Sequence, residues 1–139
     1  EPVERFYEYL DRARTARDTR RRLQNDGRLP AEWDAENAWA IVSIKAFDGA
    51  ARVFNKMRRE AISAERDPAL SAEEKRRRMD EISRNMTARA RELVSAADVV
   101  RRGGAAPAVL TEEPVQGGSR AAAGGAQGTA AGEGPSWAR

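Results

Sequence analysis

Apolar residues recur at steps of three and four along three stretches of the chain, which is the spacing of one face of an α-helix. The first stretch follows Pro2, a residue suited to the first turn of a helix, and ends near Gly27. Pro30 then separates it from the next stretch. The pattern predicts a first helix over about residues 3–26. Its apolar face holds Val3, Phe6, Tyr7, Leu10 and Ala13.

The second stretch predicts one long helix over residues 31–66, which ends at Asp67 and Pro68. The alternating steps of three and four are typical of a coiled coil. At about 1.5 Å per residue, such a helix is a rod of roughly 50 Å, too long to lie inside a globule made by so short a chain. Its apolar stripe consists of Trp33, Ala40, Ile44, Phe47, Ala51, Phe54 and Ala61 or Ile62.

The third stretch predicts a helix over residues 71–101. It opens with Ser71 and Glu74, the Ser-x-x-Glu pattern of a capping box, in which each residue satisfies a free backbone N–H at the other end. Gly103 and Gly104 close it. Its apolar positions are Met79, Ile82, Met86, Leu93, Ala96 or Ala97, and Val100.

Together these elements predict an all-α fold: a long antiparallel, coiled-coil-like hairpin of helices 31–66 and 71–101, with helix 3–26 packed along one end. The helical module would span residues 1–101. Residues 102–139 are rich in Gly and Ala and poor in large apolar side chains, so we expect a flexible, low-complexity tail. The residues predicted to form the interhelical seam, and to contact neighbouring subunits where exposed, are Trp33, Ile44, Phe47, Phe54, Met79, Ile82, Met86 and Leu93.

Composition excludes several kinds of chemistry. The chain contains no Cys and no His, which removes disulfides, thiolate nucleophiles, the usual zinc sites and every His-based proton transfer. Its paired carboxylates, such as Glu32 with Glu36, have no neighbour that would hold a metal or raise a pKa. We therefore expect no enzyme activity, no cofactor, no metal and no small-molecule substrate.

Other features bear on where the protein acts. The longest apolar run, residues 38–44, is too short to cross a bilayer, and no signal-peptide pattern is present. The sequence begins at Glu1 rather than Met, so we expect a fragment or a processed product.

Two basic clusters are candidates for contact with nucleic acid. The run at residues 75–78 has acidic residues one turn away on either side, which favours a solvated helix face over a nucleic-acid site. The expected pairs are Glu73–Arg77, Glu74–Arg78, Arg76–Asp80 and Arg77–Glu81. The basic end of helix 3–26 has fewer acidic neighbours, although cations also suit the C-terminal end of a helix dipole. The candidate phosphate contacts there are Arg14, Arg17, Arg20, Arg21 and Arg22.

The net charge of each segment also directs attention to the two basic clusters. Residues 30–67 hold six basic and seven acidic side chains, so the positive excess of the helical part lies in the segments that contain the clusters.

The tryptophans admit two interpretations. In the structural interpretation, Trp33 lies in the seam and Trp39 covers the first helix. In the functional interpretation, an exposed tryptophan anchors a binding partner. Trp137, near the end of the tail, is either a docking point or a chance residue.

The segment "DPALSAEEKRRRMDEISRNMTARARELV" resembles a helical domain associated with large polyvalent proteins of phages and mobile elements. The opening "EPVERFYEYLDRA" is similar to the lead-in of that domain, so the resemblance covers about residues 1–100. It is carried by Asp67, Pro68, Leu70, Ser71, Glu73, Glu74, Lys75, Arg76, Met79, Asp80, Glu81, Ile82, Asn85 and Arg89 or Ala90. The resemblance implies a module of a giant phage protein that is packaged in the virion and delivered with the genome, and it carries over no catalytic residue.

The functional expectation is a segment of a bacteriophage virion-internal, DNA-ejection protein that acts in assembly through helix–helix contacts. Its partners would be further copies of itself or other virion proteins, inside the phage particle and then in the host cell. The alternatives are a basic helical protein that binds nucleic acid, with DNA as its partner, and a cytoplasmic coiled-coil adaptor.

Overall fold

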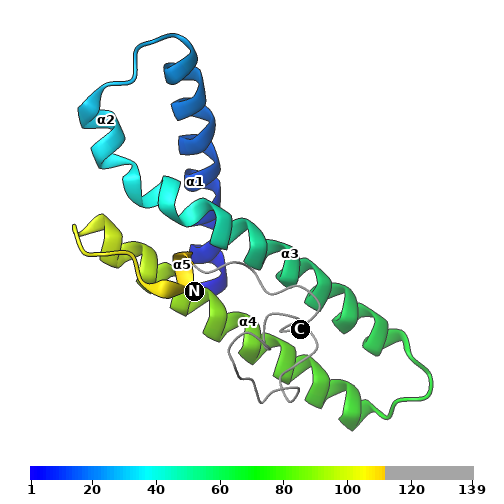
Figure 1. Cartoon of the computed structure of the whole chain (residues 1–139). Coiled ribbons are helices and arrows are strands. Elements are labelled where there is room, and N and C mark those ends of the chain that lie inside the picture. The colour runs from blue at the N-terminus through cyan, green and yellow to red at the C-terminus, as the bar shows by residue number, and fades with distance from the viewer. Residues whose placement is uncertain (112–139) are drawn as a thin grey trace, which may run out of the picture.

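A computed structural model describes residues 1–111, which form helices and no strand. The elements are α1 (Pro2–Asn25), α2 (Ala31–Glu36), α3 (Ala38–Arg66), α4 (Ala72–Arg101) and α5 (Ala108–Thr111). Helices α3 and α4 lie side by side as an antiparallel hairpin, and α1 crosses them at the end away from their connecting turn (Figure 1). The predicted all-α class and the hairpin with one preceding helix are confirmed.

Both ends of α4 follow local sequence signals. At its start, the Ser71 Oγ accepts a hydrogen bond from the Glu74 backbone N–H at 3.1 Å, and the Ser71 hydroxyl also donates to Glu74 Oε1 at 3.4 Å. At its end, Gly103 adopts a φ of 91°, a left-handed conformation that favours glycine. The N–H groups of Gly103 and Gly104 then bond to the carbonyls of Val100 and Val99, both at 2.9 Å. This Schellman arrangement satisfies carbonyls that would otherwise be free.

The predicted helix over residues 31–66 is interrupted at Asn37, which divides it into α2 and α3. The Asn37 side chain donates from Nδ2 to the Trp33 carbonyl at 2.9 Å, and its backbone N–H bonds to the same oxygen at 3.0 Å. Asn37 has φ −107° and ψ 8°, outside the α-helical range, so the chain leaves the helix at this residue although the backbone bond to Trp33 is kept. The expected rod is therefore shorter: α3 has 29 residues, or about 44 Å at 1.5 Å per residue.

The core lies where α1, α3 and α4 meet. Phe6 of α1 stacks on Phe47 of α3 with ring centres 5.0 Å apart and lies 4.9 Å from the ring of Phe54. All three side chains are fully buried. Trp39 is also buried and packs its ring 5.3 Å from that of Tyr9, so it covers the first helix as the structural interpretation expected. The aromatic residues of α1 thus fix its position on the hairpin.

The predicted seam is buried to different extents. Phe47, Phe54, Met86 and Leu93 are buried, and Trp33, Ile44 and Ile82 are half-buried. Met79 is 37% exposed although it lies on the same side of α4 as Met86. It lies close to the hairpin turn, where the helix pair stands without α1 (Figure 1). The seam is consequently closed within the chain near α1 and more open toward the turn.

The chain after residue 101 departs in part from the predicted tail. Residues 108–111 form α5, and Leu110 is 3% exposed against α3 and α4. Val109 and Leu110 are the large apolar side chains of α5. Their burial offsets the conformational entropy that is lost when this segment becomes ordered. Residues 112–139 of the predicted tail, with Trp137, lie outside the described residues. Within residues 1–111 no helix is both long and apolar enough to cross a membrane.

Candidate polyanion interface

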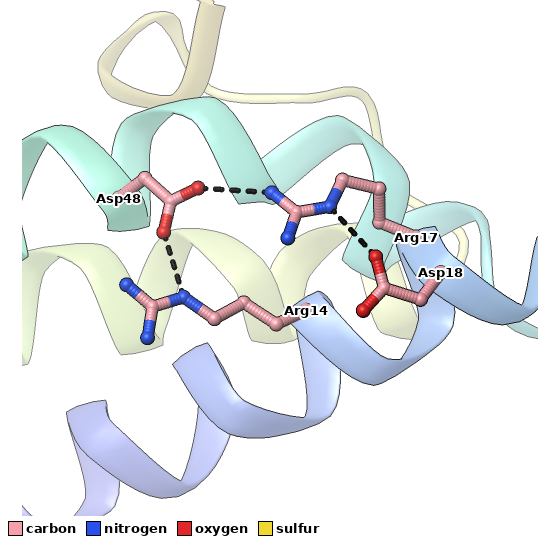
Figure 2. A network of polar contacts seen from close by, with 4 residues as sticks. All are labelled: Arg14, Arg17, Asp18 and Asp48. Carbon is pink, nitrogen blue, oxygen red and sulfur yellow. Dashed lines mark hydrogen bonds and ion pairs between the residues drawn. The ribbon is translucent and has the colours of Figure 1, made fainter.

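Two of the five arginines predicted to contact phosphate are engaged by one carboxylate on α3. Arg14 donates from Nε to Asp48 Oδ1 at 2.9 Å, and Arg17 donates from Nη1 to Asp48 Oδ2 at 3.2 Å. The Arg17 Nε also donates to Asp18 at 3.3 Å (Figure 2). Asp48 is 22% exposed and uses both oxygens in these contacts. These two arginines therefore bind α1 to α3.

A third arginine of this set, Arg20, donates from Nε to Asp34 of α2 at 2.8 Å. This hydrogen bond raises the pKa of the Arg20 guanidinium, against a smaller opposing effect of desolvation. The side chains of Arg21 and Arg22 are exposed and make no ion pair or hydrogen bond within residues 1–111. Three of the five candidates thus hold helices together, and two remain available for a ligand.

The basic run at the start of α4 does not pair as expected. None of the four predicted i, i+4 pairs forms; Arg77 instead approaches Glu74 at 4.0 Å. Glu74 is drawn toward Ser71 by the helix cap. Arg76 and Arg78 are exposed and make no ion pair within the part of the chain that the structure describes. Lys75 is half-buried.

A third basic surface, which the sequence analysis did not single out, runs along the outer side of α3. We call it the α3 ridge. Its positions follow one another at steps of four and three, so they share one helix face. They are Lys45, Gly49, Arg52, Lys56, Arg59, Ser63 and Arg66. Five of these seven positions are basic and none is acidic.

The α3 ridge lies opposite the core. Phe47 and Phe54 are fully buried, and Lys45 and Arg52 each precede one of them by two residues. Two residues correspond to about 200° of rotation around an α-helix, so the ridge side chains point away from the buried face. All five basic residues of the ridge are exposed. The first and the last of them are 21 positions apart, or about 31 Å at 1.5 Å per residue.

Most of the charge on the ridge is uncompensated. Arg52, Lys56, Arg59 and Arg66 make no ion pair or side-chain hydrogen bond within residues 1–111. The acidic residues beside the ridge, Asp48, Glu60 and Asp67, are half-buried, and Asp67 lines a shallow hollow together with Arg59, Ser63 and Arg66. Asp48 already accepts from Arg14 and Arg17. A line of exposed cations without acidic partners is the arrangement expected of a surface that binds a polyanion.

No family model, curated protein or solved structure matches the chain. Nor do the described residues hold a group of three or more acidic side chains that could bind a metal ion. The interpretation of the ridge therefore rests on its geometry and charge. The available sequence signal was the seven-residue spacing of the basic residues at 45, 52, 59 and 66.

Proposed function

We propose that this chain is a helical module that binds the phosphate backbone of nucleic acid through the α3 ridge. The observation that supports the proposal is the row of exposed basic residues, four of them unpaired within residues 1–111, on the side of α3 opposite the core. Lys and Arg side chains that neutralise phosphates release condensed counterions, which supplies most of the affinity of sequence-independent binding.

The ridge is suited to phosphates rather than bases. Proteins that hold single strands stack the bases on exposed aromatic rings. Within the described residues every aromatic side chain is buried or half-buried, and none belongs to the ridge. The small residues Gly49 and Ser63 let a bulky duplex approach the helix between the basic side chains. We therefore expect duplex DNA to be bound without sequence preference.

The strength of the salt effect follows from the number of unpaired cations. If Arg52, Lys56, Arg59 and Arg66 each neutralise one phosphate of a duplex, log Kd changes by roughly 3.6 per tenfold change in salt, at about 0.9 per contact. Raising the salt from about 50 to 200 mM would then weaken binding about 150-fold. Fluorescence anisotropy with a labelled duplex of unrelated sequence measures this slope directly.

A matched pair of variants tests the location of the interface. Arg52→Gln with Arg59→Gln removes two ridge charges, and Arg76→Gln with Arg78→Gln removes two exposed, unpaired charges from α4. Both variants lower the net charge by the same amount, so any difference between them reports position. We expect the ridge variant to reduce the salt slope by about two and the α4 variant to leave it nearly unchanged. Equal losses in both, or no binding by the unsubstituted protein, would overturn the proposal.

The end of α1 is the rival location for the same function. Its two available arginines, Arg21 and Arg22, are exposed. A third variant, Arg21→Gln with Arg22→Gln, distinguishes the two surfaces. A loss of slope in this variant alone would transfer the interface from α3 to α1.

The virion-internal role stays a prediction that rests on the resemblance of the sequence, and the helix–helix assembly stays a prediction that rests on the apolar seam. A module delivered with a genome would meet DNA, which agrees with a phosphate-binding surface. Much of the apolar seam is already closed within the chain, and the exposed large apolar residues Val42, Ile62, Met79 and Val99 are 37–51% exposed. Sedimentation at micromolar concentration checks for self-association, and a strict monomer would count against assembly between copies.

A further inference from the structure

A hollow of about 410 Å³ opens where the middle of α1, the junction of α2 with α3, and the end of α4 converge. Segments far apart in the sequence contribute to it, so the fold itself assembles the hollow. The residues that matter for its chemistry are Arg12, Glu36, Asn37, Trp39 and Arg101.

Two guanidinium groups share one pair of aromatic rings at this hollow. The Cζ atom of Arg12 lies 5.2 Å from the centre of the Trp39 ring and 5.7 Å from that of Tyr9. The Cζ atom of Arg101 lies 5.3 Å and 5.6 Å from the same two rings. Both rings are almost completely buried, at 6% and 4% exposure. Cation–π contacts with a fixed platform thus orient two like charges toward one place.

Few acceptors within the chain satisfy these groups. Arg12 makes no ion pair or hydrogen bond within residues 1–111. Arg101 donates to the Tyr9 hydroxyl at 2.8 Å and lies 3.6 Å from Asp98 Oδ1. Each guanidinium carries five N–H donors, so most donors of the pair have no acceptor within the described chain.

The carboxylate of Asp98, next to Arg101, is shared among several donors. Asp98 accepts from the Tyr9 hydroxyl at 2.5 Å, and Arg5 and Arg102 lie 3.7 and 4.0 Å from it. Glu36 lines the hollow but makes no ion pair within residues 1–111, and Glu8 interacts with Arg5 only at a distance. The hollow is thus lined by two guanidinium groups and by the carboxylate of Glu36, which forms an ion pair with neither of them within residues 1–111.

We propose that this hollow binds a phosphate dianion, either free or as a phosphate monoester. A planar guanidinium presents a fork of donors that matches two oxygens of an oxyanion. Two such forks that converge on one hollow fit the three terminal oxygens of a phosphate better than the two oxygens of a carboxylate. Trp39 and Arg101 belong to the core and to α4, whereas the α3 ridge faces away from the core, so this site is separate from the proposed polyanion interface.

The test uses the full chain with inorganic phosphate, phenyl phosphate and acetate as probes, in a buffer of low chloride content. Tryptophan fluorescence reports binding, because both guanidinium groups lie over the Trp39 ring, and Trp39→Phe identifies the source of the signal. Thermal unfolding gives a second readout. We expect saturable binding of both phosphates at millimolar concentrations, with an increase in the unfolding temperature, and much weaker binding of acetate.

Arg12→Gln is the decisive variant. Within residues 1–111 the Arg12 side chain is held by its cation–π contacts with Trp39 and Tyr9 alone. Its removal is therefore expected to weaken phosphate binding at least tenfold, and to lower the unfolding temperature without phosphate only by the loss of those two contacts. Arg21→Gln is the matched control and is expected to bind normally, as is the ridge variant with Arg52→Gln and Arg59→Gln. Equal binding of acetate, or an Arg12→Gln protein that binds phosphate as well as the unsubstituted one, would overturn the proposal. Binding of inorganic phosphate without phenyl phosphate would limit the ligand to the free ion.

Discussion

Replacement of Asp48 by Asn tests whether the arginines of α1 hold the fold together. Asp48 accepts from Arg14 Nε at 2.9 Å and from Arg17 Nη1 at 3.2 Å. Asparagine keeps the size of the side chain and its place on α3 but removes the charge. Both contacts between α1 and α3 would be weakened at once.

The expected loss is moderate because the contacts are partly exposed. The side chain of Asp48 is 22% exposed, and those of Arg14 and Arg17 are 49% and 38% exposed. Exposed ion pairs contribute about 0.2–1 kcal/mol each. Two pairs on one partly buried carboxylate should therefore contribute about 1–2 kcal/mol to the free energy of unfolding. In a domain of this size, each kcal/mol lowers the unfolding temperature by about 4–8 °C.

A double-mutant cycle isolates the ion pair from other effects of the substitutions. Thermal or urea unfolding is measured for Asp48→Asn, for Arg14→Gln and for the two together. We expect a coupling energy of about 0.5 kcal/mol that falls when the Debye length is shortened to about 3 Å in 1 M salt. Arg21→Gln serves as the control, and its coupling with Asp48→Asn should be zero.

Two results would refute this reasoning. A coupling energy of zero at low salt would mean that the contacts of Figure 2 do not stabilise the protein. The second result concerns the double variant Arg14→Gln with Arg17→Gln. It would be an unchanged free energy of unfolding together with a salt slope of DNA binding that is lower by about two. In that case the original prediction that these arginines contact phosphate would be correct.

Three substitutions test the packing. Phe47→Ala, at a fully buried position stacked on Phe6, should lower the free energy of unfolding by about 3–5 kcal/mol in urea titrations. Ser43→Ala should raise it by about 1 kcal/mol, because the buried Ser43 hydroxyl has no hydrogen-bond partner within residues 1–111; a loss of stability would contradict this. Leu110→Ala should lower the free energy of unfolding by about 2 kcal/mol. This is the lower end of the range for a buried leucine, because the four-residue α5 can shift to fill the space. An unchanged unfolding midpoint would mean that α5 does not stabilise the fold.

The sequence predicted the helices well where local signals and apolar periodicity agreed. The Ser71 cap and the Gly103 terminus bound α4 within one residue of the predicted range. The interruption at Asn37 was missed because it lies in the backbone conformation of one residue, with φ −107° and ψ 8°, which apolar periodicity does not register. Helix α5 was missed because a composition dominated by Gly and Ala obscured two apolar residues that find a place on the core.

The candidate sites were harder to predict than the fold. Runs of adjacent basic residues are conspicuous in a sequence, yet adjacent residues point in different directions around a helix. The α3 ridge consists of basic residues three, four and seven apart, within a segment whose summed charge is slightly negative. The hollow at Arg12 and Arg101 joins residues 89 positions apart, so it exists only once α1 and α4 are packed.

Asp48 also connects the stability of the fold with the proposed function. We expect Asp48→Asn to lower the free energy of unfolding and to raise the affinity for DNA. Asp48 lies one turn from Arg52 and is the carboxylate at the edge of the ridge. Its loss would release Arg14 and Arg17 and raise the local positive charge while it loosens the contact between α1 and α3. We expect duplex DNA to bind the variant more tightly and with a steeper salt dependence, as long as anisotropy is measured well below the unfolding temperature. If affinity falls together with stability, the ridge requires α1 in place, and the assignment of phosphate contacts to α3 alone would be wrong.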